Sequence, residues 1–327
     1  SGTAHGQAAL EELRGTVRSG YPVASVDTWE EERLEAILRE EADGRPVWRW
    51  SVATGFLDGP GAGRESLSDP QQALAFVAAE GSGAITLMRD LAPLLADAPA
   101  LVRAVREVYD TLAEAPGMLV MSHPGAVIPD DLGKELYTLE LPLPSVVELQ
   151  EFLARENAQL PDAERRDDDW LAHSAQHMRG ISMNEARDLF RRLARDHVTD
   201  PAETAEAIRS VKARLLRKES CLESLPVNLD LDQVGGLRSL KKWIRSRHQL
   251  FSSKAQAAGI DPPSGLLLMG VSGCGKSLAA KVIPAAWNLP LIRLDMNQVM
   301  AGVGGSPEVA WARALATAES ASPVVLW

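Results

Sequence analysis

The sequence predicts an α/β protein with two parallel-sheet domains joined by a helical segment. Short apolar runs alternate with helix-like patterns from residue 21 to residue 141, which favours parallel strands connected by helices. The stretch that follows is rich in helix-start signals, and a glycine-rich phosphate-binding pattern occupies residues 270–277. We therefore predict domains at residues 1–144, 145–222 and 223–327.

The first predicted domain contains five strand-plus-helix units. Such units predict a parallel sheet that is covered on both faces. The expected strands are 21–26, 46–53, 84–88, 117–122 and 136–141, and the expected helices are 29–41, 70–80 and 98–113, with a loop at 58–69.

This first domain does not carry a phosphate loop where one would be expected. After Val26 the chain continues with Asp27, Thr28, Trp29 and three glutamates, without a glycine to form a phosphate cradle and without a lysine. Glutamates in a first helical turn complement the helix dipole and repel polyphosphate. Asp90 follows the strand 84–88, where a metal-directing carboxylate would lie in such a fold. Because no phosphate loop lies opposite it, we interpret Asp90 as a remnant of a lost site or as a helix cap. We predict a nucleotide-binding fold without its site.

The middle segment is predicted to be helical. Ser145 with Glu148 and Ser182 with Glu185 form capping-box patterns, and Pro201 occupies a first helical position. His173 and His177 lie four residues apart, a spacing that can ligate zinc. Because no third ligand is placed with them, surface histidines are the preferred interpretation.

The pattern at 270–277 is the chemical centre of the sequence. It follows an apolar run at 264–269, predicted to be a buried parallel strand, and precedes a helix-like stretch that begins at Ser277. Glycine N–H groups and the helix N-terminus would surround phosphate, Lys276 would contact the β- and γ-phosphates, and Ser277 would ligate Mg²⁺. A chance match on a glycine-rich turn is the alternative. The predicted ATP-binding set here is Gly270, Val271, Ser272, Gly273, Cys274, Gly275, Lys276, Ser277 and Leu278.

Two further features bear on this site. Val234, Gly235 and Gly236 would let the backbone approach a flat base with an apolar contact, or else form a plain turn before a helix at 237–250. Cys274 lies beside Lys276 at a helix N-terminus, which can lower a thiol pKa and make it oxidisable. A small residue tolerated at a variable position is the preferred interpretation, and redox control is the hypothesis to be tested.

Composition excludes several classes of protein. A net charge of −11 argues against a dedicated nucleic-acid surface, although it leaves room for a local basic patch. No apolar run approaches the length of a membrane span, so no membrane contact is expected. Two cysteines form no disulfide framework, which favours the cytoplasm.

The sequence resembles the AAA ATPases first catalogued as an open reading frame of algal chloroplast genomes and also widespread in bacteria. The residues that carry the resemblance are Tyr21-Pro22, 28–33, 50–52, 180–186, 234–237, the phosphate loop and 291–295. The resemblance implies a degenerate RecA/AAA-like P-loop domain with a helical lid, followed by an active AAA module. It also implies a homo-oligomeric ring, usually a hexamer, that couples ATP hydrolysis with Mg²⁺ to remodelling of a macromolecular partner.

The same resemblance places Val234–Gly236 beside adenine and the segment 300–308 at the pore loop. Gly302 stands where an aromatic residue is usual, which puts threading through a pore in doubt. Pro284 lies inside the helix after the phosphate loop and should kink it. The apolar residues 324–327 resemble the strand before the acidic Walker B pair, so the chain is expected to be part of a longer protein. By itself it is expected to bind nucleotide weakly, not to hydrolyse it, and a monomer is one of its expected states.

Three interpretations of function follow. The first is an ATP hydrolase that remodels a protein partner whose identity the sequence does not give. The second is a nucleotide-dependent switch or scaffold, in which the first domain recruits partners without motor activity. The third is a small-molecule kinase, which the glycines at 235–236 and the two ATPase-like domains disfavour.

Overall fold

The computed structural model divides the chain into two compact units. It describes residues 2–125, 128–218, 221–225, 231, 234–247, 250, 265–271, 273–287, 289–302, 306–320 and 324–327. The first unit comprises residues 1–143 together with 182–184, and the second comprises residues 144–181 and 185–327. Each unit is described by itself.

The first unit is built on a six-stranded sheet in the order β3-β2-β4-β5-β1-β6. The strands are β1 (Val23–Asp27), β2 (Val47–Ser51), β3 (Gly55–Phe56), β4 (Ile85–Arg89), β5 (Met118–Ser122) and β6 (Tyr137–Glu140). Five of them are parallel, as the sequence predicts, and β3 pairs antiparallel with β2 at one edge. Strand β3 is not among the predicted strands and adds an antiparallel edge, because the tight turn after β2 returns the chain beside the same strand.

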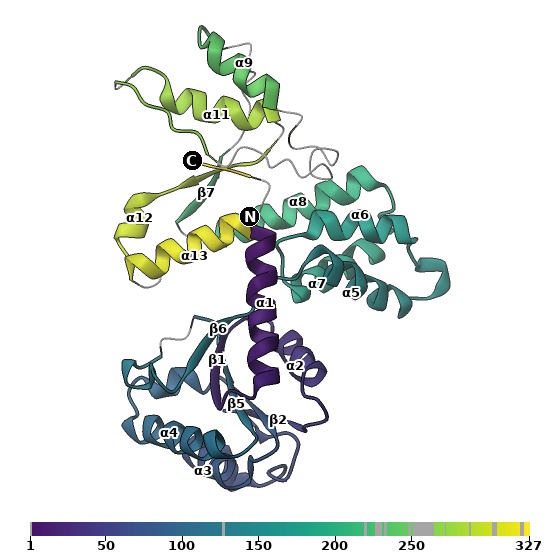
Figure 1. Ribbon diagram of the computed structural model, residues 1–327. Helices are drawn as coiled ribbons and strands as arrows, with labels where there is room; N and C mark the ends of the chain where they lie inside the picture. The colour runs from purple at the N-terminus through teal and green to yellow at the C-terminus, as the bar shows by residue number, and fades with distance from the viewer. Residues whose placement is uncertain are drawn as a thin grey trace. The chain divides into compact units, whose positions relative to one another are not determined.

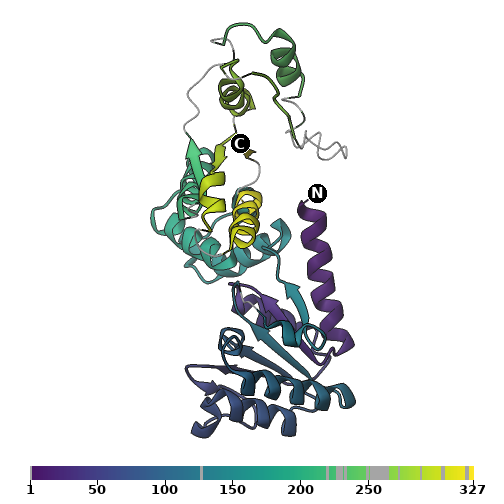
Figure 2. The same cartoon turned by 90° about the vertical axis from the view of Figure 1, so that its left-hand side faces the viewer.

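Helices cover both faces of this sheet (Figures 1 and 2). One face packs against α1 (Gly2–Ser19) and α2 (Glu31–Glu40), and the other packs against α3 (Pro70–Glu80) and α4 (Pro99–Glu114). Helix α1 is absent from the sequence-based prediction. Its Leu13 and Val17, one helical turn apart, are fully buried and extend the apolar core.

Strand β2 contributes side chains to both hydrophobic cores of the first unit. Its side chains alternate, so that Val47 joins the core beneath α1 and α2 whereas Trp48 and Trp50 join the core beneath α3 and α4. Trp50 is fully buried, and its indole Nε1 donates to the carbonyl of Leu67 at 2.7 Å. The buried indole N–H therefore has a partner, which such burial requires.

The second unit begins with four helices. These are α5 (Val146–Ala158), α6 (Asp168–Met178), α7 (Met183–Arg195) and α8 (Pro201–Lys218). The first two residues of α7 belong to the first unit. The predicted capping box is confirmed at α5, since the Ser145 hydroxyl accepts from the Glu148 N–H at 3.2 Å and the Glu148 carboxylate accepts from the Ser145 N–H at 2.9 Å. Short 3₁₀ turns lie at Glu65–Ser68, Ala92–Leu95, Asp130–Leu132 and Asp162–Glu164.

A smaller sheet in the order β7-β8-β9 follows these helices. Its strands are β7 (Leu222–Leu225), β8 (Leu291–Leu294) and β9 (Val325–Leu326), with helices α9 (Arg238–Arg247), α11 (Lys276–Trp287), α12 (Met296–Met300) and α13 (Pro307–Ser320). The predicted strand near 324–327 is confirmed and runs parallel to β8, whereas β7 is antiparallel to it. The described part of this sheet is therefore mixed.

The predicted buried strand at 264–269 is wrong for its described residues. Residues 265–269 have no regular structure, and Leu267 and Met269 are 80% and 83% exposed. An apolar run becomes a strand only where a neighbouring strand supplies hydrogen bonds, and none of the described strands pairs with this segment.

Among the residues that the structure describes, no helix combines the length and the apolar character needed to cross a membrane.

Candidate functional site

The glycines of the phosphate loop are required by its backbone. Gly273 and Gly275 have φ values of +81° and +90°, a left-handed conformation that other residues rarely adopt. At Gly270 a Cβ atom would lie 2.5 Å from the Sγ atom of Cys274, so a side chain would collide with the loop itself. The loop conformation therefore explains glycine at all three positions. Ser272 lies outside the described residues.

Lys276 is the first residue of α11, and its ammonium group is turned toward the loop. Its Nζ atom donates to the carbonyl oxygens of Gly270 at 2.7 Å and Val271 at 2.8 Å, and lies 3.9 Å from Sγ of Cys274. Two carbonyl oxygens of the loop therefore hold the ammonium group of Lys276.

The start of α11 has the electrostatics of an anion site. Its first turn contains no acidic residue, and the first N–H groups of a helix have no intrahelical partners. Ser277 and Leu278 are exposed in this turn, and Leu278 is 42% exposed. The predicted phosphate contacts and the predicted Mg²⁺ ligand Ser277 therefore lie together at one helix end.

Val234 lies beside the same helix. It is 7% exposed and packs in an apolar cluster with Ile244 of α9 and Val282 of α11. A small apolar pocket between α9 and α11 is lined by Leu231, Val234, Leu237, Leu240, Lys241, Ile244, Ala279 and Val282. Gly235 and Gly236 are exposed next to it, and Gly236 has a φ of +69°. The structure therefore brings Val234 and the helix of the phosphate loop to one apolar pocket.

Two departures from the AAA pattern have local structural counterparts. Gly302 has a φ of +65°, so a glycine relieves strain that an aromatic residue would incur at this position. Pro284 is buried within α11, which continues past it to Trp287. A proline there removes one backbone hydrogen bond of the helix.

In the first unit the corresponding helix start carries carboxylates, and Glu30 is buried rather than facing solvent. Glu30 is 4% exposed; its Oε2 lies 2.8 Å from NH1 of Arg33, and its Oε1 accepts from the Met183 N–H. Arg33 also donates to the carbonyl of Pro142. The expectation that Glu30 stands with Glu31 and Glu32 in the first helical turn is therefore wrong, because α2 begins at Glu31. Glu30 instead precedes the helix and accepts a hydrogen bond from the backbone at residue 183.

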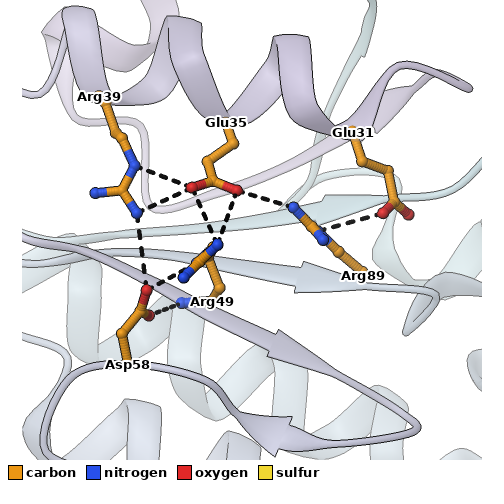
Figure 3. Close-up of polar contacts among 6 residues, drawn as sticks. All are labelled: Glu31, Glu35, Arg39, Arg49, Asp58 and Arg89. Carbon is orange, nitrogen blue, oxygen red and sulfur yellow. Dashed lines mark hydrogen bonds and ion pairs between the residues drawn. The ribbon is translucent and has the colours of Figure 1, made fainter. Parts of the chain in front are cut away.

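Glu31 belongs to a half-buried ion-pair network that the sequence-based prediction missed (Figure 3). Arg89, at the end of β4, lies 3.3 Å from Glu31 and 2.9 Å from Glu35. Arg49 lies 2.7 Å from Asp58, whose hydrogen bond raises the pKa of the guanidinium, and Arg39 lies 2.9 Å from Glu35. The only sequence signal for this network was the presence of glutamates in a predicted helix and of arginines in or beside predicted strands. Internal cations, not an external ligand, neutralise these carboxylates.

Asp90 reaches the carboxyl edge of the first sheet, where a metal-directing carboxylate was one expectation. It has a φ of +58°, and its Oδ1 lies 2.8 Å from Nδ1 of His123, which follows β5. Its carboxylate contacts this histidine, and Leu91 occupies the cap position of the turn that follows. Among the described residues, no group of three or more possible ligands is gathered for a metal ion.

The pair His173 and His177 lies on α6, as the spacing predicted. Their rings are 4.2 Å apart, and Nδ1 of His177 lies 2.9 Å from the carbonyl oxygen of His173. His177 is exposed and His173 is half-buried, with no third ligand gathered beside them in the described part of the chain.

Comparison with known proteins agrees with this architecture. Residues 9–141 match the family model of the SpoVK-like AAA ATPase N-terminal domain, and residues 266–327 match the model of the AAA family, the ATPases associated with various cellular activities. The chain is 28% identical to an uncharacterized AAA domain-containing protein ycf46 of Guillardia theta, over 97% of this chain and 63% of the relative. It is 27% identical to the ycf46 protein of Pyropia yezoensis, over 97% of this chain and 65% of that protein.

Other similarities are confined to a smaller part of the chain. A putative ribosome biogenesis ATPase nvl of Dictyostelium discoideum is 35% identical over 30% of this chain and 12% of its own length. The chain spans just under two thirds of the length of the ycf46 relatives. The chain is therefore similar to the Ycf46-like AAA domain-containing proteins along nearly its whole length.

Proposed function

We propose that the chain binds ATP with Mg²⁺ at the phosphate loop, and that the whole protein hydrolyses ATP to remodel a macromolecular partner. The observation that supports this most is the glycine loop closed over by Lys276 at the start of α11. The donor groups there are N–H groups and an ammonium, which suit a polyphosphate.

Each residue of the phosphate loop has a proposed role in ATP binding. Gly270, Gly273 and Gly275 let the backbone surround the phosphates, while Lys276 leaves the carbonyls of Gly270 and Val271 and pairs with the β- and γ-phosphates. Ser277 would hold the magnesium ion, which neutralises phosphate charge when bound. The apolar cluster at Val234 lies beside α11 and would contact the base.

In this proposal the first unit binds no nucleotide. At the start of α2, Glu31 lies in an ion pair with Arg89, and Glu30 is buried against Arg33. Assembly of the whole protein into a ring, as a hexamer, and its cytoplasmic location remain parts of this proposal, supported by the family resemblance.

Titration with a fluorescent ATP analogue tests the binding step on this chain. Lys276→Ala should lower affinity at least tenfold, roughly 1.4 kcal/mol, because it removes a cation from the phosphates. Lys281→Ala, on the same helix but outside the loop, is the matched control and should leave affinity unchanged. Equal affinity of the Lys276 variant and the parent would overturn the assignment of the site.

Steady-state ATPase measurement on the whole protein tests the hydrolysis step. Turnover that Lys276→Ala abolishes would support the motor interpretation. Binding without turnover above background would instead favour the second interpretation, a nucleotide-dependent switch or scaffold.

A further inference from the structure

Helix α9 is a basic element in an acidic chain. The chain has a net charge of −11, yet residues 233–260 contain six lysines and arginines and no aspartate or glutamate. Five of these six basic residues lie within α9, at Arg238, Lys241, Lys242, Arg245 and Arg247. The sign of the local charge is therefore opposite to that of the protein as a whole.

The apolar side of α9 is already occupied by α11. Ile244 is 1% exposed, and the Trp287 Nε1 donates to the Ile244 carbonyl at 2.9 Å. The rings of Trp243 and Trp287 are tilted against each other, with centroids 5.9 Å apart. Arg247 lies over the Trp243 ring at 4.5 Å. Lys241 donates to the carbonyl of Val234. These contacts leave a different side of the helix facing outward.

The outward side carries Arg238, Lys242 and Arg245, all of them exposed. Their spacing of four and then three residues places them on one face of the helix. With a rise of 1.5 Å per residue, the seven steps from Arg238 to Arg245 cover about 10 Å along the helix axis. This row of cations, with Ser239 and Ser246 exposed in the same helix, is named the α9 basic face.

We propose that the α9 basic face binds the phosphodiester backbone of nucleic acid, independently of base sequence. Three cations in a row match a ligand with repeated negative charges better than a single small anion. The only aromatic side chain of α9, Trp243, is engaged by Trp287 and Arg247, so the face contacts phosphates without stacking on bases.

Other acidic occupants fit this face less well. A lipid surface would require an apolar side of the helix to enter the interface, and that side is packed against α11. A second copy of this chain, which is acidic overall, is distinguished from nucleic acid by its effect on the oligomeric mass. The α9 basic face is separate from the nucleotide loop, so nucleic-acid binding there does not depend on the proposed ATP binding.

Fluorescence anisotropy with a labelled 20-nucleotide oligo(U) RNA measures the interaction directly. Three phosphate contacts predict a slope of about −2 for log affinity against log salt with a single strand, and about −2.7 with duplex DNA. Oligo(U), oligo(A) and mixed sequences are expected to bind within roughly threefold of one another, because phosphate contacts carry no sequence information.

Neutralisation of the face provides the decisive variant. Arg238→Gln/Lys242→Gln/Arg245→Gln should lower affinity at least tenfold at low salt and bring the salt slope close to zero, since each lost phosphate contact removes about 0.7 from it. The matched control is Arg191→Gln/Arg192→Gln/Arg195→Gln on α7, which changes the net charge equally at exposed arginines, two of them near Glu156 and Asp196. The control should bind as the parent does. Circular dichroism of both variants reports whether they fold.

Three results would overturn the proposal. They are absence of binding by the parent at low salt, equal loss in the α7 control, and full binding by the folded α9 variant. If the α9 substitutions instead change the oligomeric mass in a salt-dependent way and leave RNA anisotropy unaffected, the face is an interface between copies of this chain and the nucleic-acid assignment is wrong.

Discussion

Removal of the Glu30 carboxylate should destabilise the first unit far more than removal of an exposed partner in a similar ion pair. Glu30 and Arg33 are 4% and 8% exposed, and their charged atoms lie 2.8 Å apart. Breaking a buried pair from one side leaves an uncompensated charge and costs about 3–5 kcal/mol. Glu30→Ala also deprives the Met183 N–H of its acceptor. A loss of this size is a large part of the 5–15 kcal/mol that typically separates native and unfolded proteins.

The chain offers a matched comparison for this prediction. Arg103 and Glu107 form an ion pair at 3.2 Å whose side chains are 63% and 60% exposed, so Glu107→Ala should cost only about 0.3–0.5 kcal/mol. Hydrogen-exchange mass spectrometry on peptides from β1 and α2, combined with urea unfolding, reports the stability of the first unit. Glu30→Ala/Arg33→Leu should be less destabilised than Glu30→Ala, because it also removes the stranded cation. Similar costs for Glu30→Ala and Glu107→Ala would refute the reasoning.

Three further outcomes follow from particular residues. Gly275→Ala should weaken binding of the ATP analogue because alanine at a φ of +90° is strained by about 1–2 kcal/mol, whereas Gly265→Ala, at an open position without positive φ, should not. Burial and the charge of Arg179 lower the pKa of Lys212 to about 8 from 10.5, so the unfolded chain holds this proton more tightly than the folded chain does. The free energy of unfolding should therefore rise between about pH 8 and 10.5. The urea midpoint of Lys212→Met should lack that rise. Peroxide should reduce the affinity for the ATP analogue in the parent but not in Cys274→Ser. Cys274 is exposed and lies 3.9 Å from Lys276, whereas Cys221 is buried. Unchanged affinity in the parent would exclude redox control.

The strands of the first unit were predictable because each is a short apolar run bounded by turn residues. Predicted 84–88 and 117–122 correspond to β4 and β5 within one residue at each end. Strand β3 was missed because two residues, Gly55 and Phe56, carry no periodic signal, and it forms only as the antiparallel neighbour of β2. The same limit explains the error at 265–269, where hydrophobicity indicated burial but could not indicate which strand would pair there.

The candidate site was predictable to a different extent in each unit. The roles proposed for Gly273, Gly275 and Lys276 follow from a local pattern, because the chemistry of a phosphate loop is contained in consecutive residues. The pairing of Glu31 with Arg89 joins residues 58 positions apart and depends on strand order, which the local sequence does not contain. The burial of Glu30 likewise depends on Met183, far along the chain.

Two helix starts in this chain separate the effects of charge and of backbone on phosphate binding. Helix α11 begins with Lys276 after glycines of positive φ, whereas α2 begins with Glu31 after Asp27–Glu30, where no residue has a positive φ. Glu31→Lys would therefore give α2 a cation without giving it a cradle of backbone N–H groups. In a Lys276→Ala background this substitution is expected to break the ion pair with Arg89 and to leave affinity for the ATP analogue at the level of Lys276→Ala alone. If affinity rose above that level, charge at the helix start would be sufficient, and the glycine backbone would not be the feature that distinguishes the two units.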